Sequence, residues 1–122
     1  MTPNDAPGPE ARWREALDEG RILLQRDPAS GAVFFPPRVC GPEGQALEWI
    51  EACGTGTVYA VTTIHPRPPL EPYNVALVDL AEGVRMMSRV DGIAADDIAI
   101  GSAVVAAIAQ TRDGPLVVFH PA

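Results

Sequence analysis

The stretch Tyr73–Asp91, YNVALVDLAEGVRMMSRVD, has the pattern of a β-hairpin. Two arms, Asn74–Leu80 and Val84–Val90, flank a short turn that ends in glycine. Because side chains alternate along a strand, the second arm has one apolar face and one face that carries both arginines. The apolar face consists of Val84, Met86 and Val90. The other face consists of Arg85, Met87 and Arg89.

The sequence on both sides of this hairpin is also rich in strand signals. Thr57–His65, TVYAVTTIH, has apolar residues on both faces, which is typical of a long, bent strand with two packing surfaces. The prolines of Pro66–Pro72 indicate a loop or an uncovered edge. After a connector, Ser102–Gln110 and Leu116–His120 form a second predicted hairpin. About five strands within ~70 residues have the spacing of a small barrel.

The N-terminal part of the chain has a different pattern. Residues 1–9 contain three prolines and are predicted to be a disordered lead. Trp13, Ala16 and Leu17 are spaced i, i+3, i+4, which predicts a short amphipathic helix that ends at Gly20. A helix this short is marginal alone, so its apolar stripe must lie on its own domain or on a partner.

Gln25–Gln45, QRDPASGAVFFPPRVCGPEGQ, has the outline of a pair of metal knuckles. Two glycine-containing turns flank an apolar run, as in a hairpin between two ligand-bearing loops. Only one residue of this stretch, Cys40, is a thiol. The outline of a zinc ribbon is therefore present without the usual zinc ligands.

The composition is that of a globular protein, with 47% hydrophobic and 20% charged residues among 122. The formal net charge of -7 counts against nucleic acid as a partner. All nine basic residues are arginine, a residue that suits contacts with carboxylate or phosphate. The base composition of the genome is the simpler explanation for the absence of lysine. The two cysteines make no disulfide framework. Without a secretory signal or a membrane span in the sequence, a cytoplasmic location is expected.

Four segments together resemble the acyl-CoA-associated OB-fold proteins, the family named domain of unknown function 35. They are RWREALDEGRILLQRD, GAVFFPPRVC, GTGTVYAVTTIHP and PYNVALVDLAEGVRMMSRVDG. The resemblance extends from Arg12 to Phe119. It implies a mainly β chain, with a helix and a degenerate rubredoxin-like zinc ribbon over residues 10–50 and a five-stranded OB-fold barrel over residues 51–122.

The resemblance also places the expected metal ligands of the ribbon. The two CxxC knuckles of the family fall at Asp27 and Ser30 and at Cys40 and Glu43. One of four thiolates remains, which makes a poor tetrahedral zinc site, so we expect no stoichiometric zinc. The hairpin is then expected to be held by apolar side chains, namely Phe34, Phe35, Val39, Leu47 and Trp49.

Candidate catalytic residues are few. Cys40 and Cys53 are interpreted as inert thiols rather than reactive ones. His65 and His120 lie at strand ends beside prolines, and we interpret them as polar caps rather than as a catalytic pair. Asp96-Asp97 fits a solvated turn. The sequence shows no nucleophile–base pair, so we expect a subunit whose chemistry belongs to another protein.

Two sets of residues are candidate contacts. Arg85 and Arg89 could meet anionic groups, such as the phosphates of an acyl-CoA, or could face solvent and pair with Asp79 or Glu82. Candidate partner-docking residues are Trp13, Leu17, Phe34, Phe35 and Arg38.

The resemblance implies a non-catalytic accessory subunit, paired with a thiolase-like enzyme or with a hydratase or aldolase acting on acyl-CoA. Two alternatives remain open: a nucleic-acid-binding OB module, and a small standalone protein that binds or converts acyl-CoA. Homo-oligomerisation is also open, and no membrane partner is expected.

Overall fold

The computed structural model describes residues 8–122, so most of the predicted disordered lead lies outside the described residues. Helix α1 (Pro9–Asp18) begins one residue earlier than expected, with proline in its first turn. It ends as predicted, because Gly20 adopts a positive φ of 80° and its N–H donates to the carbonyl of Leu17. Within residues 8–122, no helix is long and apolar enough to cross a membrane.

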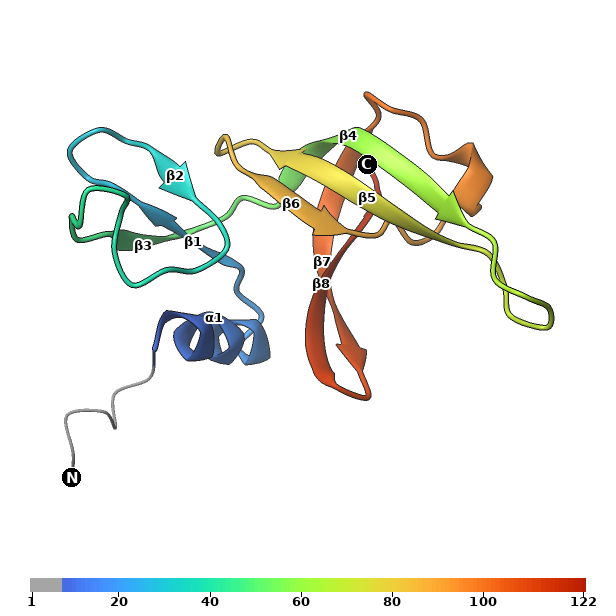
Figure 1. Ribbon diagram of the computed structural model, residues 1–122, viewed down its shortest axis with the longest axis horizontal. Coiled ribbons are helices and arrows are strands. Elements are labelled where there is room, and N and C mark those ends of the chain that lie inside the picture. Colours follow the sequence, from blue (N-terminus) through green and yellow to red (C-terminus); the bar gives the residue numbers. More distant parts are fainter. Residues whose placement is uncertain (1–7) are drawn as a thin grey trace.

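A small antiparallel sheet follows the helix (Figure 1). Its strands lie in the order β2-β1-β3. The bounds are β1 (Leu23–Arg26), β2 (Val33–Phe34) and β3 (Glu48–Glu51). The loops of the predicted knuckles connect β1 to β2 and β2 to β3, so this sheet is the body of the ribbon module.

The rest of the chain forms a five-stranded antiparallel sheet in the order β6-β5-β4-β7-β8. The bounds are β4 (Thr55–Ile64), β5 (Tyr73–Leu80), β6 (Arg85–Ser88), β7 (Ala103–Thr111) and β8 (Gly114–Pro121). A parallel bridge between Val90 and Phe119 joins the two ends of this sheet. The sheet thereby curls into a nearly closed barrel, which confirms the predicted OB-fold.

The register of the β5–β6 hairpin agrees with the sequence pattern. Met86 pairs with Val78, and both side chains are buried in the barrel core. Arg85 pairs with Asp79 on the outer face, and Met87 is 70% exposed. In β4, a register shift between Val58 and Ala60 marks a bulge, which bends the strand as barrel closure requires.

Helix α1 packs against the barrel of its own chain, where it contacts β8. Leu17 is 1% exposed and belongs to the same core cluster as Leu24 of the small sheet and Phe119 of the barrel. The apolar stripe of the helix is therefore covered within the chain, and Leu17 is not available to a partner. Helix, small sheet and barrel share one core.

Candidate functional site

The two candidate anion-binding arginines are already engaged, in different ways. Nε of Arg85 donates to Oδ1 of Asp79 at 2.7 Å, and its guanidinium stacks on the Tyr59 ring at 3.4 Å. The hydrogen bond to Asp79 raises the pKa of Arg85 above its usual value, so the group stays charged. Asp79 is one of the two carboxylates, with Glu82, that the sequence offers as pairing partners if the arginines face solvent. Arg85 is thus held flat against the outside of the barrel.

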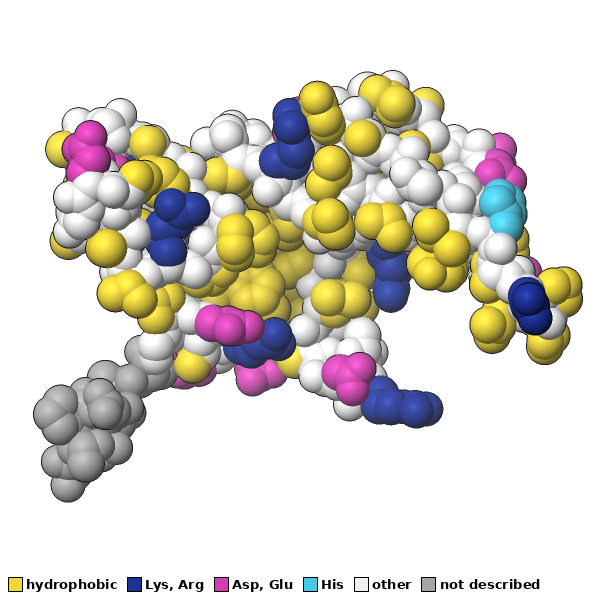
Figure 2. Space-filling model, in the orientation of Figure 1, with side chains coloured by type: hydrophobic (Ala, Val, Ile, Leu, Met, Phe, Trp, Pro, Cys, Tyr) yellow, Lys and Arg dark blue, Asp and Glu magenta, His cyan; other side chains and the backbone are white. Residues whose placement is uncertain are grey.

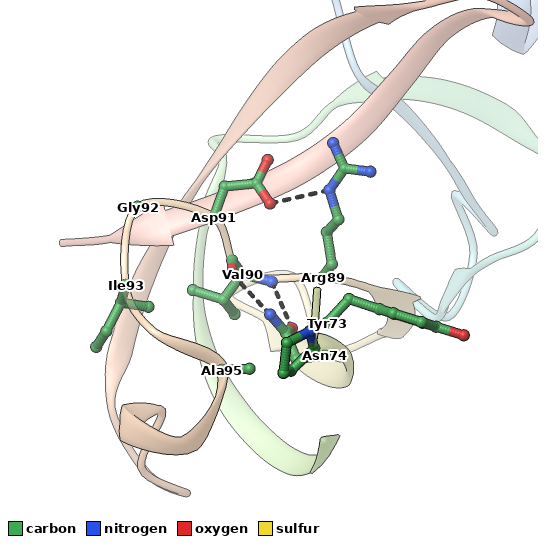
Figure 3. Close-up of a pocket in the computed structure, with 9 residues that line it drawn as sticks. Tyr73, Asn74, Arg89, Val90, Asp91, Gly92, Ile93 and Ala95 are labelled. Atoms are coloured by element: carbon green, nitrogen blue, oxygen red, sulfur yellow. Dashed lines mark hydrogen bonds and ion pairs between the residues drawn. The ribbon is translucent and has the colours of Figure 1, made fainter. Parts of the chain in front are cut away.

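Arg89 lines a cavity of about 300 Å³ beside the end of β6 (Figure 3). Its Nε donates to Oδ1 of Asp91 at 2.9 Å. Tyr73 and Ile93, both exposed, belong to the same lining. The cavity therefore combines one cation, one carboxylate and apolar surface, a mixture that suits an amphipathic ligand better than a simple anion.

The floor of this cavity is fixed by Asn74. Its Nδ2 donates to the carbonyl of Val90 at 2.9 Å, and the N–H of Val90 donates to its Oδ1 at 2.8 Å. Both residues are buried. Just beyond, the N–H of Asp91 donates to the carbonyl of Phe119. The contacts that shape the cavity are therefore also the contacts that close the barrel.

In the ribbon module, the side chain at the first knuckle position, the carboxylate of Asp27, accepts hydrogen bonds on both of its oxygens. Asp27 is buried, and its Oδ1 accepts the N–H of Ala29 at 2.9 Å. Its Oδ2 accepts Ser30 Oγ at 3.0 Å and Gln45 Nε2 at 3.2 Å. The hydrogen bond from Ala29, followed by that from Gln45, lowers the pKa of Asp27. The Asp27 carboxylate is therefore ionised and fully engaged at neutral pH.

The four degenerate knuckle positions do not form a metal centre. Among residues 8–122, no group of three or more His, Cys, Asp or Glu side chains is placed to hold a metal ion. Cys40 is an exposed thiol, and Glu43 is also exposed. Zinc prefers thiolate and imidazole ligands, and Asp27 already accepts three hydrogen bonds. The residues present do not fit a structural zinc ion.

The candidate docking residues divide into two groups. Trp13 and Phe35 contact each other, with ring centroids 5.5 Å apart, and Trp13 Nε1 donates to the carbonyl of Leu23. These two join the helix to the ribbon module. Phe34 instead lies under the Arg38 guanidinium, 4.9 Å from ring centroid to Cζ, and both are half-buried. Phe34 and Arg38 remain accessible at the surface.

The position of Val39 differs from the sequence-based expectation. It was predicted to help hold the hairpin, yet it is 85% exposed and extends the surface formed by Phe34 and Arg38. The side chain of Gln25 holds the backbone of this loop in place. Its Nε2 donates to the carbonyl of Arg38, and its Oε1 accepts the N–H of Arg38. Sequence reasoning missed Gln25 because a glutamine in a short strand gives no distinctive signal.

The remaining candidates do not belong to the lining of the cavity. His65 Nε2 is 4.0 Å from Asp96 Oδ1, and both side chains are exposed. His120 is exposed near Gly92. The Cys53 thiol lies 3.2 Å from Thr55 Oγ1, and its backbone N–H donates to a Glu82 carboxylate oxygen. The structure does not bring the two histidines and the two thiols together.

Comparison with known proteins places this architecture in a family. Residues 14–42 match the family described as ChsH2, rubredoxin-like zinc ribbon domain. Residues 49–109 match the family described as ChsH2, C-terminal OB-fold domain. A DUF35 domain-containing scaffold protein of Methanothermobacter thermautotrophicus is 32% identical over 108 residues, which cover 83% of this chain and 81% of that protein. The chain belongs to the ChsH2/DUF35 family.

Two further relatives extend the comparison. A probable enoyl-CoA hydratase alpha subunit of Thermomonospora curvata is 43% identical over 100 residues, which cover 78% of this chain but only 31% of that larger protein. A chain of a solved structure entitled Ltp2-ChsH2(DUF35) aldolase superposes with a TM-score of 0.80 at 36% identity, covering 96% of this chain and 97% of that chain. Members of the ChsH2/DUF35 family thus carry the names of hydratase, aldolase and scaffold proteins.

Proposed function

We propose that this chain is a non-catalytic accessory subunit of an acyl-CoA-processing complex, paired with a thiolase-like enzyme or with a hydratase or aldolase. The observation that carries the proposal is the likeness over nearly the whole chain to a chain of the structure named Ltp2-ChsH2(DUF35) aldolase, with a TM-score of 0.80. The names of the hydratase alpha subunit and of the scaffold protein support the same class of role.

The arrangement of side chains supports a role in assembly. The cavity beside Arg89 has no histidine, cysteine or serine in its lining, and its one carboxylate, that of Asp91, accepts a hydrogen bond from Arg89. Hydrophobic side chains gather in a hollow where the small sheet, α1 and the barrel meet (Figure 2). The half-buried side chains of Phe34 and Arg38 and the exposed side chain of Val39 add a contact surface on the ribbon module. Exposed apolar surface of this kind is typical of protein–protein contacts.

We further propose that Arg89 contacts the anionic part of a CoA thioester. Only one nitrogen of its guanidinium is used by Asp91, which leaves the outer nitrogens for a phosphate. Arg85 is the weaker candidate of the pair, because Asp79 and Tyr59 occupy its charge and its flat face. Tyr73 and Ile93 would contact the apolar part of the ligand.

The nucleic-acid alternative receives little support from the barrel. Single-strand binding by an OB-fold uses a basic groove and stacking aromatics. Phe119, one of the three aromatic residues in this part of the chain, is 0% exposed at the centre of the core. Tyr59 is covered on one face by Arg85. Together with a net charge of -7, this leaves few stacking platforms and no favourable field.

The docking part of the proposal is tested by co-expression with the nearest thiolase-like, hydratase or aldolase gene, followed by co-purification. The double change Phe34→Ala and Val39→Ala should reduce the recovered complex, because both side chains belong to the proposed contact surface. Leu70→Ala is the matched control, since Leu70 is 68% exposed on the loop between β4 and β5. Equal recovery of complex with both variants would show that the partner binds elsewhere.

The ligand part is tested by titrating the complex with an acyl-CoA. Arg89→Ala should weaken binding about tenfold or more, the effect of losing a hydrogen bond from a charged group. Arg112→Ala removes the same charge from the turn between β7 and β8 and should leave the affinity unchanged. If both variants bind alike, Arg89 does not contact the ligand, whatever the outcome of the docking test.

A further inference from the structure

Both knuckle turns of the ribbon are closed by backbone hydrogen bonds. In the first turn, the N–H of Asp27 donates to the carbonyl of Ala32, and the N–H of Gly31 donates to the carbonyl of Asp27. In the second turn, the N–H of Gly41 donates to the carbonyl of Gln45. Gly31 and Gly44, each directly after the second degenerate position, have φ of 80° and 79°. Each loop is therefore a closed turn that ends in a glycine of positive φ, although the residues present do not fit a zinc ion.

The two turns are joined by one side chain, that of Gln45. Its Nε2 donates to Oδ2 of Asp27 in the first turn, at 3.2 Å. Its Oε1 accepts the N–H of Glu43 in the second turn, at 2.8 Å. A single amide thus contacts both loops, the connection that a structural metal ion makes when its ligands come from two knuckles. Ser30 completes the cluster, since its Oγ donates to Asp27 and accepts the N–H of Ala32.

Gly41 makes room for this amide. A Cβ atom at position 41 would lie 2.5 Å from Oε1 and 2.6 Å from Nε2 of Gln45, too close for any real contact. The Gln45 side chain is therefore packed flush against the backbone of the second turn. Gly41 does not have the positive φ that usually requires glycine, so the close approach of the Gln45 side chain is the reason for a glycine at this position.

We infer that the hydrogen-bonded cluster of Asp27, Ser30 and Gln45 has taken the place of the structural zinc ion, so that the ribbon module of this chain folds without metal. The chemistry of the cluster fits this substitution: three uncharged donors stabilise one buried carboxylate by hydrogen bonds, where a divalent cation would bind thiolates. Cys40 and Glu43 contribute no side-chain hydrogen bond to the cluster, and their exposure leaves them outside it.

The test compares two sets of variants by thermal unfolding, with and without a strong chelator. Gln45→Ala and Gly41→Ala remove or expel the amide, and each should lower the Tm by about 8 °C, as expected for two lost hydrogen bonds. The matched control is the double change Cys40→Ser and Glu43→Gln, which removes the two remaining metal-type side chains. It should leave the Tm unchanged, and the chelator should have no effect on any of these proteins.

If a variant fails to fold, hydrogen exchange of the wild-type protein and zinc binding by a cysteine-restored variant still test the inference. In the wild-type protein, the amide protons of Ala29 and Glu43 should be protected from hydrogen exchange in the presence of chelator. The change of Asp27, Ser30 and Glu43 together to cysteine should give a protein that binds one zinc per chain and becomes sensitive to the chelator, because the turns are retained. About one zinc per wild-type chain, a chelator-sensitive Tm, or destabilisation by the Cys40 and Glu43 changes would overturn the inference. Failure of the cysteine-restored protein to bind zinc would overturn it too.

Discussion

The closure of the barrel depends on Asn74, and its replacement by alanine should be among the more damaging single changes in this chain. Its amide makes a matched pair of hydrogen bonds with the backbone of Val90, at 2.9 Å and 2.8 Å. Val90 is 2% exposed and forms the bridge to Phe119 that joins the ends of the sheet. Asn74→Ala leaves one N–H and one carbonyl without these partners at that junction.

The cost follows from the number of groups left unpaired. A buried polar group without a partner costs about 1–3 kcal/mol, so two such groups give about 2–6 kcal/mol. Asn74 and Val90 also line the 300 Å³ cavity, from which water can reach the freed groups. We therefore expect the lower half of that range, about 2–4 kcal/mol. This is a large fraction of the ~5–15 kcal/mol that usually stabilises a domain.

Equilibrium unfolding in urea, followed by tryptophan fluorescence, measures this cost directly. The control is Ser88→Ala, which removes the single hydrogen bond from Ser88 Oγ to the carbonyl of Val117 at 2.7 Å. It should cost about 1 kcal/mol. If Asn74→Ala is within about 0.5 kcal/mol of wild type, or no worse than Ser88→Ala, the closure does not depend on the Asn74 amide.

Three further changes should be measurable by the same unfolding assay. Trp13→Phe keeps an aromatic ring but replaces the indole with a smaller phenyl group and removes the donor to the carbonyl of Leu23, so it should cost at least about 1 kcal/mol; no loss would mean that the bond contributes nothing net. Gly56→Ala places a methyl group 2.7 Å from Cγ1 of Val78 inside the barrel and should cost about 1–3 kcal/mol, whereas a neutral effect would require the core to shift freely. Because the pKa of Asp27 is lowered in the folded state, its stabilising effect is present at neutral pH and is lost as the pH falls below about 4. The stability difference between wild type and Asp27→Asn should therefore shrink between pH 7 and pH 3, and a constant difference would argue against this titration.

The strand pattern predicted most of the barrel, because local alternation and packing agree there. Val84 and Met86 are buried and Arg85 is exposed, as the period of two requires. The sequence alone does not show whether Leu17 is covered by the same chain or by a partner. A narrow apolar stripe predicts that something lies on it, but the identity of that surface depends on how the barrel folds back beside the helix.

The ribbon module shows where sequence reasoning ended. The loss of thiolates at Asp27, Ser30 and Glu43 was visible, but Gln45 was not a candidate because it lies outside the four knuckle positions. Its role arises only when the loops on either side of β2 are folded together, which places Gln45 Nε2 3.2 Å from Asp27 Oδ2. Val39 was assigned to the core from its residue type alone, and its 85% exposure shows that an isolated valine in a loop carries little information.

Turnover of an acyl-CoA, measured for the chain alone, for the thiolase-like, hydratase or aldolase enzyme alone, and for the two co-purified, tests the central claim most directly. An accessory subunit should show no turnover by itself, should be recovered with the enzyme in fixed stoichiometry, and should give a complex whose activity exceeds that of the enzyme alone. Turnover by the purified chain at a rate that the enzyme does not change, without any recovered complex, would contradict the account.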